Sequence, residues 1–296
     1  MFNESGAEGP YGGLFSVQIT IRETDTDTMG RGEIVTAGID VGSISVESVI
    51  FHEKRGVLGY SIVLTGGDSK EAAEVSLENA LCDSKIDALK IAYRISTGCG
   101  REIVTRVNER VTEITCLARG VNYLFPDCRT IVDIGGQDTK VIQVNESGKV
   151  LAFDMNDKCA AGTGRFLEVM ARALNVDLDR IGERSLQFKN EIQISSICTV
   201  FAESEVISLV SEGRRVEDIL HALHQTVADR TLSLLERIGG ASGKVAMTGG
   251  VAKNIGVVKA IEAKLKVPLK IYHEPQIVNA LGAALISLEK VKAEKR

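Results

Sequence analysis

One pattern occurs twice in this sequence: a short apolar run that ends in an aspartate and a glycine-containing turn. The first copy spans residues 34–43 and ends in Asp40-Val41-Gly42-Ser43, and the second spans residues 130–136 and ends in Asp133-Ile134-Gly135-Gly136. Apolar runs of this length that stop at a turn are typical of buried strands. Because further strand-like segments follow both copies, the sequence predicts two similar α/β lobes, each of which presents an acidic turn to a shared cleft.

Apolar periodicity predicts the remaining elements and the lobe boundaries. Strands are predicted at 46–51, 60–64, 91–93, 141–144, 150–153, 244–247 and 269–272, and helices at 69–81, 113–124, 162–174, 199–211, 216–238, 257–265 and at the C-terminal end, where Leu281, Ala284, Leu285 and Leu288 share one face. We assign residues 34–126 plus 281–296 to a first lobe and residues 127–280 to a second. Residues 1–33 are expected to form a poorly ordered extension, or to add a strand to a sheet edge.

Composition narrows the possible classes of function. The chain has 296 residues, a net charge of -5 and no block of five like charges, which argues against nucleic-acid binding. No apolar run approaches the roughly 18 residues expected of a membrane span, and the N-terminus lacks the pattern of a secretory signal. The six cysteines are spread thinly through the chain, so we expect a cytoplasmic protein without a disulfide framework.

The acidic turns suit a Mg-nucleotide. Glycines let backbone N–H groups approach phosphate oxygens, and carboxylates orient Mg²⁺ through its waters. A third turn, residues 248–254 with the sequence Thr-Gly-Gly-Val-Ala-Lys-Asn, follows a predicted strand and precedes a predicted helix. The sequence contains neither a Walker-type loop nor a well-placed Gly-x-Gly-x-x-Gly motif, so these three turns are the candidates for phosphate binding. Gln137 offers no nucleophile and is predicted to orient a water molecule.

Cys159 and Cys198 each stand just before a predicted helix, after a polar turn. A helix N-terminus favours the thiolate form of cysteine. Two cysteines cannot complete a four-thiolate iron–sulfur site, but a symmetric dimer that contributes two from each chain can. A half zinc site and reactive thiols without a metal are the alternatives. The other four cysteines (Cys82, Cys99, Cys116 and Cys128) are expected to be buried apolar thiols, and His221 and His224 are expected at the surface.

The motifs around both cysteines and the later turns carry a family resemblance. Residues 155–166 and 195–205, together with 133–138 and 248–254, resemble the ATPases that activate 2-hydroxyacyl-CoA dehydratases (component A), a family that includes the ATPase subunits of ATP-dependent benzoyl-CoA reductase. The resemblance implies an α/β fold of two ribonuclease H-like lobes, of the acetate kinase/sugar kinase/Hsp70/actin type, with an interlobe nucleotide cleft. It also implies a dimer that holds one [4Fe–4S] cluster at the subunit interface.

The resemblance also assigns roles to individual residues. It implies that Cys159 and Cys198 are cluster ligands, and that ATP and Mg²⁺ are contacted by Asp40, Gly42, Ser43, Asp133, Gly135, Gly136, Gln137, Asp138, Gly249 and Gly250. Within this set we assign catalytic roles to Gln137, Asp133 and Asp138. The family usually carries a lysine shortly after the first Asp-x-Gly-Ser motif, but Ser45-Val46-Glu47-Ser48 supplies none, so positive charge near the phosphates is lost.

The function that the resemblance implies is ATP-driven one-electron donation. A ferredoxin or flavodoxin reduces the cluster, ATP hydrolysis changes the angle between the lobes, and the electron passes to an iron–sulfur enzyme that dehydrates or reduces a CoA thioester. The second ATPase subunit of the dimer is an identical or a related chain, since benzoyl-CoA reductases pair non-identical ATPase subunits. A metabolite kinase of the same fold and a nucleotide-dependent scaffold are the competing functions, and a kinase has no need of thiols at two helix starts.

Overall fold

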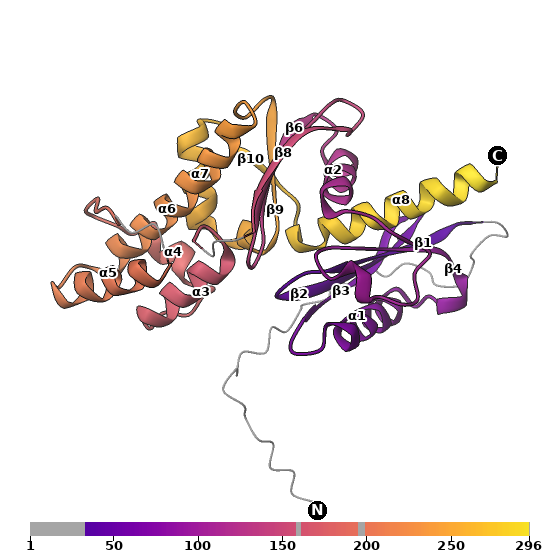
Figure 1. Cartoon of the computed structure of the whole chain (residues 1–296), viewed down its shortest axis with the longest axis horizontal. Coiled ribbons are helices and arrows are strands. Elements are labelled where there is room, and N and C mark those ends of the chain that lie inside the picture. The colour runs from indigo at the N-terminus through magenta and orange to yellow at the C-terminus, as the bar shows by residue number, and fades with distance from the viewer. Residues whose placement is uncertain (1–32, 158–160, 195–198, 296) are drawn as a thin grey trace, which may run out of the picture. The chain divides into compact units, whose positions relative to one another are not determined.

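Two five-stranded sheets form the framework of the residues that the structure describes (Figure 1). The structure is a computed structural model that describes residues 33–157, 161–194 and 199–295. The first sheet has the strand order β3-β2-β1-β4-β5, and the second has the order β10-β9-β6-β7-β8. The strands of the first sheet are β1 (Val35–Val41), β2 (Ser45–His52), β3 (Gly56–Leu64), β4 (Ile91–Thr97) and β5 (Glu109–Arg110). Those of the second are β6 (Cys128–Ile134), β7 (Thr139–Val144), β8 (Val150–Asn156), β9 (Lys244–Thr248) and β10 (Leu269–Ile271).

The two sheets also share their strand directions. In each sheet the first three strands form an antiparallel meander, and the last two run parallel to the first. β1 and β6 are therefore central strands, and nearly all of their residues are buried. A strand that is covered on both faces has a nearly continuous apolar sequence, and for this reason both strands could be predicted from their apolar runs. Asp40 and Asp133 lie near the carboxyl ends of β1 and β6.

The first sheet is packed against two long helices. α1 (Ser69–Ser84) packs on β2 and β3, and α8 (Val278–Glu294) packs on β1, β2 and β4. α1 begins where the Asp68 side chain accepts hydrogen bonds from the backbone N–H groups of Lys70 and Glu71, and it ends at Lys85 in the left-handed conformation. The helix is thus bounded by local capping, while its position comes from packing.

Small residues let α8 approach its neighbours closely. A Cβ at Gly38 in β1 would collide with the backbone carbonyl of Ala280, and a Cβ at Gly282 would collide with that of Cys116 in α2 (Glu113–Leu124). Thr36 Oγ1 also donates a hydrogen bond of 2.8 Å to the Ala284 carbonyl. These contacts bind the C-terminal helix to β1 and α2.

The second sheet has its own apolar core. Phe166 and Met170 come from α3 (Gly164–Ala173), and they pack with apolar residues of α6 (Val216–Arg237) and α7 (Ile255–Leu265). α5 (Thr199–Ser211) contributes Ala202 and Val206 to the same core, and α4 (Ile181–Ser185) contributes Ile181. Asn254 caps the start of helix α7, because its side chain accepts hydrogen bonds from the N–H groups of Gly256 and Val257.

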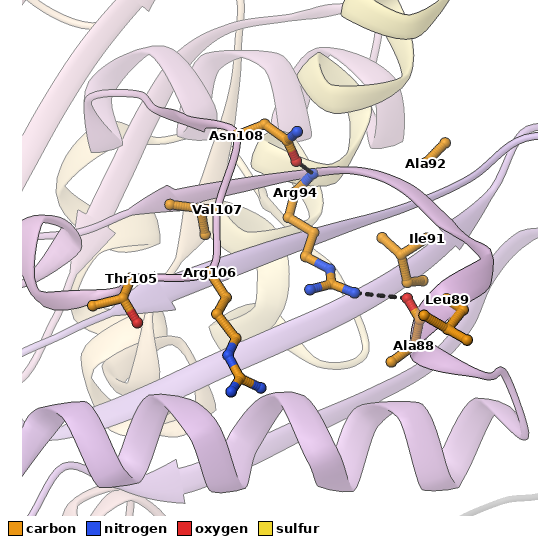
Figure 2. A pocket seen from close by; sticks show the side chains of 9 residues that line it. All are labelled: Ala88, Leu89, Ile91, Ala92, Arg94, Thr105, Arg106, Val107 and Asn108. Carbon is orange, nitrogen blue, oxygen red and sulfur yellow. Dashed lines mark hydrogen bonds between the residues drawn. The ribbon is translucent and has the colours of Figure 1, made fainter.

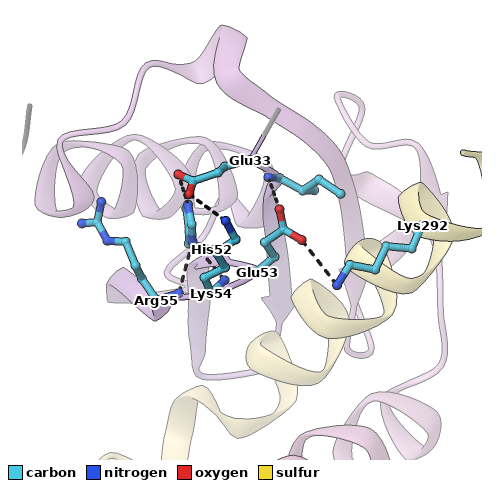
Figure 3. A network of polar contacts seen from close by, with 7 residues as sticks. Glu33, His52, Glu53, Lys54, Arg55 and Lys292 are labelled. Carbon is cyan, nitrogen blue, oxygen red and sulfur yellow. Dashed lines mark hydrogen bonds and ion pairs between the residues drawn. The ribbon is translucent and has the colours of Figure 1, made fainter. Parts of the chain in front are cut away.

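A polar network holds the start of the described chain against the first sheet (Figure 3). His52, whose side chain is fully buried, lies 3.2 Å from Glu33, and Lys54 reaches the same carboxylate at 3.2 Å. The Ile34 N–H donates to Glu53 over 3.0 Å, and Lys292 of α8 lies 3.5 Å from Glu53. The network thus connects residues 33–34 to the end of β2 and to α8.

The predicted strands and the seven predicted helices are confirmed, with shifts at their ends. β4 continues to Thr97, and the short helix α4 was not expected. The surface prediction is wrong for His224, which is 1% exposed because α6 is packed into the core along much of its length. Burial is confirmed for Cys116 and Cys128, but Cys82 and Cys99 are exposed. The expectation for residues 1–32 lies outside the described residues, and no described helix is long and apolar enough to cross a membrane.

Candidate active site

The first acidic turn connects β1 to β2. Gly42 N–H donates to the Ser45 carbonyl over 3.0 Å, which closes a tight turn with Ser43 exposed at its tip. Thr65, after β3, fastens this turn from the side, because its hydroxyl donates to the Gly42 carbonyl over 2.9 Å. A Cβ at Gly42 would clash with the Ser45 carbonyl, so glycine is required at this point of the turn.

The second acidic turn, between β6 and β7, repeats this construction. Gly135 N–H donates to the Asp138 carbonyl over 3.0 Å, and a Cβ at Gly135 would lie 2.6 Å from Asp138 Oδ1. Gln137 is exposed at the tip of the turn. The structure thus places Gly135, Gln137 and Asp138 in one turn, directly after Asp133.

The third turn follows β9, the parallel neighbour of β6. Asp133 and Thr248 are register partners, and Thr248 Oγ1 donates a hydrogen bond of 2.7 Å to Asp133 Oδ1. Gly249 has a φ of 82°, and a Cβ there would collide with the Ile134 carbonyl. Gly250 is exposed and begins a short 3₁₀ helix, Gly250–Lys253. The carboxyl ends of two parallel strands therefore meet at Asp133.

Lys140 lies inside a group of carboxylates. Its Nζ is 2.7 Å from Asp138, 3.3 Å from Glu113 and 3.5 Å from Asp133, and its side chain is 4% exposed. Burial by itself would lower the pKa of Lys140, but the carboxylates of Asp133, Asp138 and Glu113 together raise it above the ordinary lysine value. Burial raises the pKa of both Asp133 and Glu113, while the Lys140 charge opposes that rise. Lys140 therefore stays protonated, while Asp133 and Glu113 resist ionisation.

Two further carboxyl groups from the first sheet complete this acidic region. Asp40 and Glu47 are register partners in β1 and β2. Burial raises the pKa of Asp40 to about 7, with a further upward contribution from Glu113 and a downward one from the Asn279 side chain. Burial, followed by the charge of Asp40, raises the pKa of Glu47 well above its ordinary value. The turns of the two sheets face a common volume, because Gly136 of the second turn lies against the Ile44 side chain of the first. Asp40 and Glu47 both sense the charge of Asp133 across this volume.

The residues of this volume fit a Mg-nucleotide. The Oδ1 atom of Asp40 is buried and has no hydrogen-bond partner, which is costly unless a ligand supplies one. Excess negative charge and three glycine turns match a divalent cation and its phosphates. Among the described residues, no group of three or more His, Cys, Asp or Glu is arranged to hold a metal ion directly. Mg²⁺ would therefore be held partly by phosphate oxygens and water, as is usual for this ion.

Cys159 and Cys198, the predicted cluster ligands, lie outside the described residues. The helices that follow them are described: α3 begins at Gly164 and α5 begins at Thr199. α3 and α5 pack against each other, and α5 leaves Val200, Phe201, Ile207 and Val210 exposed. The predicted helix starts after both cysteines are thus confirmed.

The second acidic turn is hydrogen-bonded to the beginning of α3. The N–H groups of Gly164 and Arg165 donate to the carbonyls of Gly135 and Gly136 over 2.9 and 2.8 Å. Thr139, at the start of β7, donates to the Gly162 carbonyl over 3.0 Å. Two hydrogen bonds from the candidate phosphate turn and one from the start of β7 therefore reach residues 162–165, which lie directly after the segment that contains Cys159.

Sequence reasoning missed three charged residues of this site: Glu47, Glu113 and Lys140. The sequence marks Glu47 only as part of a segment that lacks a lysine, without a position relative to Asp40. The repeated pattern contained a signal for two of them, because Glu47 and Lys140 each stand seven residues after the aspartate of their turn. Glu113 carried no such signal, since only packing brings the start of α2 to β7.

A separate surface pocket of about 410 Å³ lies beside β4 (Figure 2). Arg94 and Arg106 extend along it, and the Arg94 side chain donates to the Ala88 carbonyl over 2.6 Å. Leu89, which is 93% exposed, lies at its edge. None of the predicted site residues lines this pocket, so it is distinct from the acidic region.

The fold and this site define a nucleotide-binding protein of the sugar kinase and actin type, and comparisons with known proteins identify its family. The profile of the BadF/BadG/BcrA/BcrD ATPase family matches residues 37–287. The activator of lactoyl-CoA dehydratase from Anaerotignum propionicum is 45% identical over 254 residues, which cover 86% of this chain and 97% of the relative. A benzoyl-CoA reductase subunit from Thauera aromatica is 34% identical over 85% of this chain and 92% of the relative.

Solved structures agree with this result. The activator of 2-hydroxyisocaproyl-CoA dehydratase from Clostridium difficile, solved with bound ADPNP, superposes with a TM-score of 0.84 at 40% identity over 88% of this chain and 97% of that one. A ROK family glucokinase from Streptomyces griseus, 12% identical over 86% of this chain and 99% of that one, has a TM-score of 0.54 and shows the shared fold alone. The chain belongs to the BadF/BadG/BcrA/BcrD ATPase family, and the predicted fold class and family are confirmed.

Proposed function

We propose that this protein hydrolyses ATP to inject low-potential electrons into a partner enzyme that acts on a CoA thioester, as a 2-hydroxyacyl-CoA dehydratase activator. The regions that match this chain cover nearly the whole length of the relatives named as activators, which supports an activator of the same kind. The proposed cofactors are ATP, Mg²⁺ and a [4Fe–4S] cluster shared by two subunits. A ferredoxin or flavodoxin is the proposed electron source.

One observation carries the proposal: the hydrogen bonds between the phosphate turn and the start of α3. A shift of Gly135 and Gly136 on nucleotide binding or hydrolysis must move the N–H groups of Gly164 and Arg165, or break their hydrogen bonds. Those two residues stand only five and six positions after Cys159 in the chain. A change at the nucleotide therefore has a short covalent and hydrogen-bonded route to the proposed cluster ligand. A metabolite kinase needs no such connection.

Different residues of the site are proposed to contact the phosphates, the Mg²⁺ ion and the attacking water. The N–H groups of Gly42, Gly135 and Gly249 already donate to backbone carbonyls. Other backbone N–H groups of the three turns would approach the phosphate oxygens, because the glycines leave no side chain in the way. Asp40, Asp133 and Asp138 orient the hydrated Mg²⁺, which would neutralise charge on the phosphates. Gln137, which is exposed at the tip of the turn, would orient the attacking water.

The two sheets are proposed to act as two lobes that change their angle with the nucleotide state. The first comprises residues 34–126 and 281–296, and the second comprises residues 127–280. Asp40 belongs to the first lobe and Asp133 to the second, so a nucleotide held by both connects the lobes. Cys159 and Cys198 both belong to the second lobe, where a cluster would store and release one electron.

A second ATPase subunit is proposed to cover the exposed face of α5. Val200 and Phe201 are 67% and 68% exposed, and Ile207 is 54% exposed. Large apolar side chains gathered on one exposed helix are typical of a protein interface. Because α5 begins directly after Cys198, an interface there would bring the cysteines of two chains together.

The direct test measures iron and acid-labile sulfide per chain, with oligomeric mass, on anaerobically purified protein. About two irons per chain in a dimer are expected, and Cys159→Ala and Cys198→Ala should each abolish them. Cys82→Ser, at an exposed cysteine on α1, is the matched control and should keep the iron. Zinc instead of iron, or no metal after reconstitution, would contradict the proposal and favour a kinase.

A subunit of an ATP-dependent benzoyl-CoA reductase is the second candidate. The segment Ser45-Val46-Glu47-Ser48 favours it, because it lacks the lysine that the activators usually carry after the first acidic turn, and a benzoyl-CoA reductase subunit from Thauera aromatica is a relative. Activity separates the two candidates. The reduced protein with ATP is mixed with a 2-hydroxyacyl-CoA dehydratase or with the catalytic subunits of a benzoyl-CoA reductase, and turnover with one of them identifies the partner.

A further inference from the structure

The two acidic hairpins differ at one equivalent position. In the β6–β7 hairpin, Lys140 lies directly opposite Asp133, and in the β1–β2 hairpin, Glu47 lies directly opposite Asp40. Side chains of directly opposed residues project from the same face of an antiparallel pair. The second hairpin therefore carries an acid and a base at its turn, whereas the first carries two acids.

Lys140 occupies the place that a cation would take among these acids. Its Nζ lies within 3.5 Å of three carboxylates, from Asp133, Asp138 and Glu113, that come from a strand, a turn and a helix. An ammonium group donates up to three hydrogen bonds to oxygen acceptors, and Mg²⁺ is also bound by oxygen ligands such as carboxylates. Asp133 and Asp138 are also the carboxylates proposed to orient Mg²⁺, so the two cations compete for them.

The surrounding charge makes this competition consequential. Asp40, Glu47, Glu113, Asp133 and Asp138 contribute five carboxyl groups, and Lys140 contributes a positive charge that Asp40, Glu113 and Asp133 all sense. Nucleotide phosphates would add more negative charge to this volume. Glu47 is itself an acid and cannot offset this negative charge, so the β1–β2 hairpin needs a positive charge from outside the hairpin.

We propose that Lys140 is the phosphate-positioning residue of this site, and that it alternates with Mg²⁺. Without nucleotide, its ammonium group lies among Asp133, Asp138 and Glu113 and takes the place of the metal. When Mg-nucleotide binds, the hydrated metal, held partly by the phosphates, takes Asp133 and Asp138, and the long lysine side chain turns to the phosphates. The inference rests on the proposed ATP site and adds to it the residue that supplies the charge missing at Glu47.

The test uses two titrations of Lys140→Gln, because the proposal predicts opposite changes. Calorimetric titration with MgCl₂ alone should show Mg²⁺ binding about tenfold or more tighter than in wild type, since the competing ammonium is gone. Titration with Mg-ADPNP should show binding at least about tenfold weaker, because a charge-assisted contact to phosphate is lost. Equal weakening of both ligands, or no change in either, would overturn the proposal.

Controls separate this role from a structural one. Lys259→Gln removes an exposed lysine that forms an ion pair with Glu262 over 2.8 Å, and it should change neither titration. Lys140→Arg keeps the charge and should recover most of the nucleotide affinity if charge at this place is what matters. Wild-type protein that fails to bind Mg-ADPNP would instead refute the ATP site itself.

A relocated charge provides a second, independent variant. Glu47→Lys gives the first hairpin the same acid–base pair as the second, and it should tighten Mg-ADPNP binding. In the Glu47→Lys/Lys140→Gln double variant the nucleotide affinity should return toward wild type, while Lys140→Gln alone stays weak. A double variant as weak as Lys140→Gln would contradict the proposal. This comparison remains decisive if Lys140→Gln is poorly folded alone, because Glu47→Lys in the wild-type background must still tighten binding.

Discussion

Ile44 and Gly136 lie in direct contact, although they belong to turns of different sheets. Ile44 follows Ser43 in the β1–β2 turn, and Gly136 lies in the β6–β7 turn. A Cβ at Gly136 would collide with both Cβ and Cγ1 of Ile44. The two acidic turns therefore touch at this point, beside the volume shared by their carboxyl groups.

The Ile44–Gly136 contact predicts a pair of compensating substitutions. Gly136→Ala should lower the free energy of unfolding by about 1–3 kcal/mol through overpacking, and should weaken Mg-ADPNP binding because the turns are forced apart. Adding Ile44→Ala should recover most of both losses. Chemical denaturation and nucleotide titration of the single and double variants measure this coupling. Gly67→Ala, at a glycine with no atom near its Cβ position, is the control, and an equal loss there would contradict the explanation.

Thr248 is predicted to orient Asp133 through its 2.7 Å hydrogen bond. Thr248→Val preserves the shape of the side chain but removes the hydroxyl donor, so it should cost about 1 kcal/mol of stability and lower the ATPase kcat. Thr248→Ser keeps the hydroxyl and should retain activity. Urea denaturation and steady-state ATPase assays test both variants. A Thr248→Val enzyme with wild-type kcat would show that Asp133 needs no such support.

The burial of Glu47 should make the folded protein less stable as pH rises. Burial holds the pKa of Glu47 well above its ordinary value of 4.5, so the folded protein keeps a proton that the unfolded chain releases. The free energy of unfolding must therefore fall as pH rises above 4.5, by up to about 1.4 kcal/mol per pH unit until the folded-state pKa is passed.

Glu47→Gln keeps a hydrogen-bond acceptor for Ser45 and removes the ionisable carboxyl. Its stability should therefore be closest to wild type near pH 5 and clearly higher than wild type at pH 8. Urea denaturation at both pH values measures the difference. Parallel pH profiles for the two proteins would mean that Glu47 does not titrate differently on folding.

The burial of His224 should have the opposite effect and make the folded protein less stable as pH falls. Burial lowers the pKa of His224 to about 3, so the unfolded chain takes up a proton below pH 6.5 that the folded protein excludes. Stability should fall as pH drops from 6.5 toward 3, by up to about 1.4 kcal/mol per pH unit. His224→Gln should flatten the slope of the free energy of unfolding between pH 7 and pH 5. His221→Gln, at a partly exposed residue stacked on Phe188, should change the slope less.

Much of the fold followed from local sequence patterns. The apolar runs before Asp40 and Asp133 predicted the two central strands, and the Gly and Asn signals after β7 and β9 predicted turns that the structure contains. Such features depend on residues close together in the chain, so they are readable without tertiary contacts. Local patterns did not predict the burial of His224. The buried face of α6 includes polar residues as well as apolar ones, and only tertiary packing shows which polar residues it covers.

The sequence by itself determined the class of this protein: the repeated acidic turn, the glycines that clear space for phosphate, and the family motifs that the comparisons bear out. Tertiary structure decided the chemistry of the charges. Lys140, Glu113 and Asp133 are far apart along the chain or on different elements, and Glu47 matters through its register with Asp40. Coulomb interactions and burial depend on distance in space, so only folding could show which acids share a cation and which acids face each other.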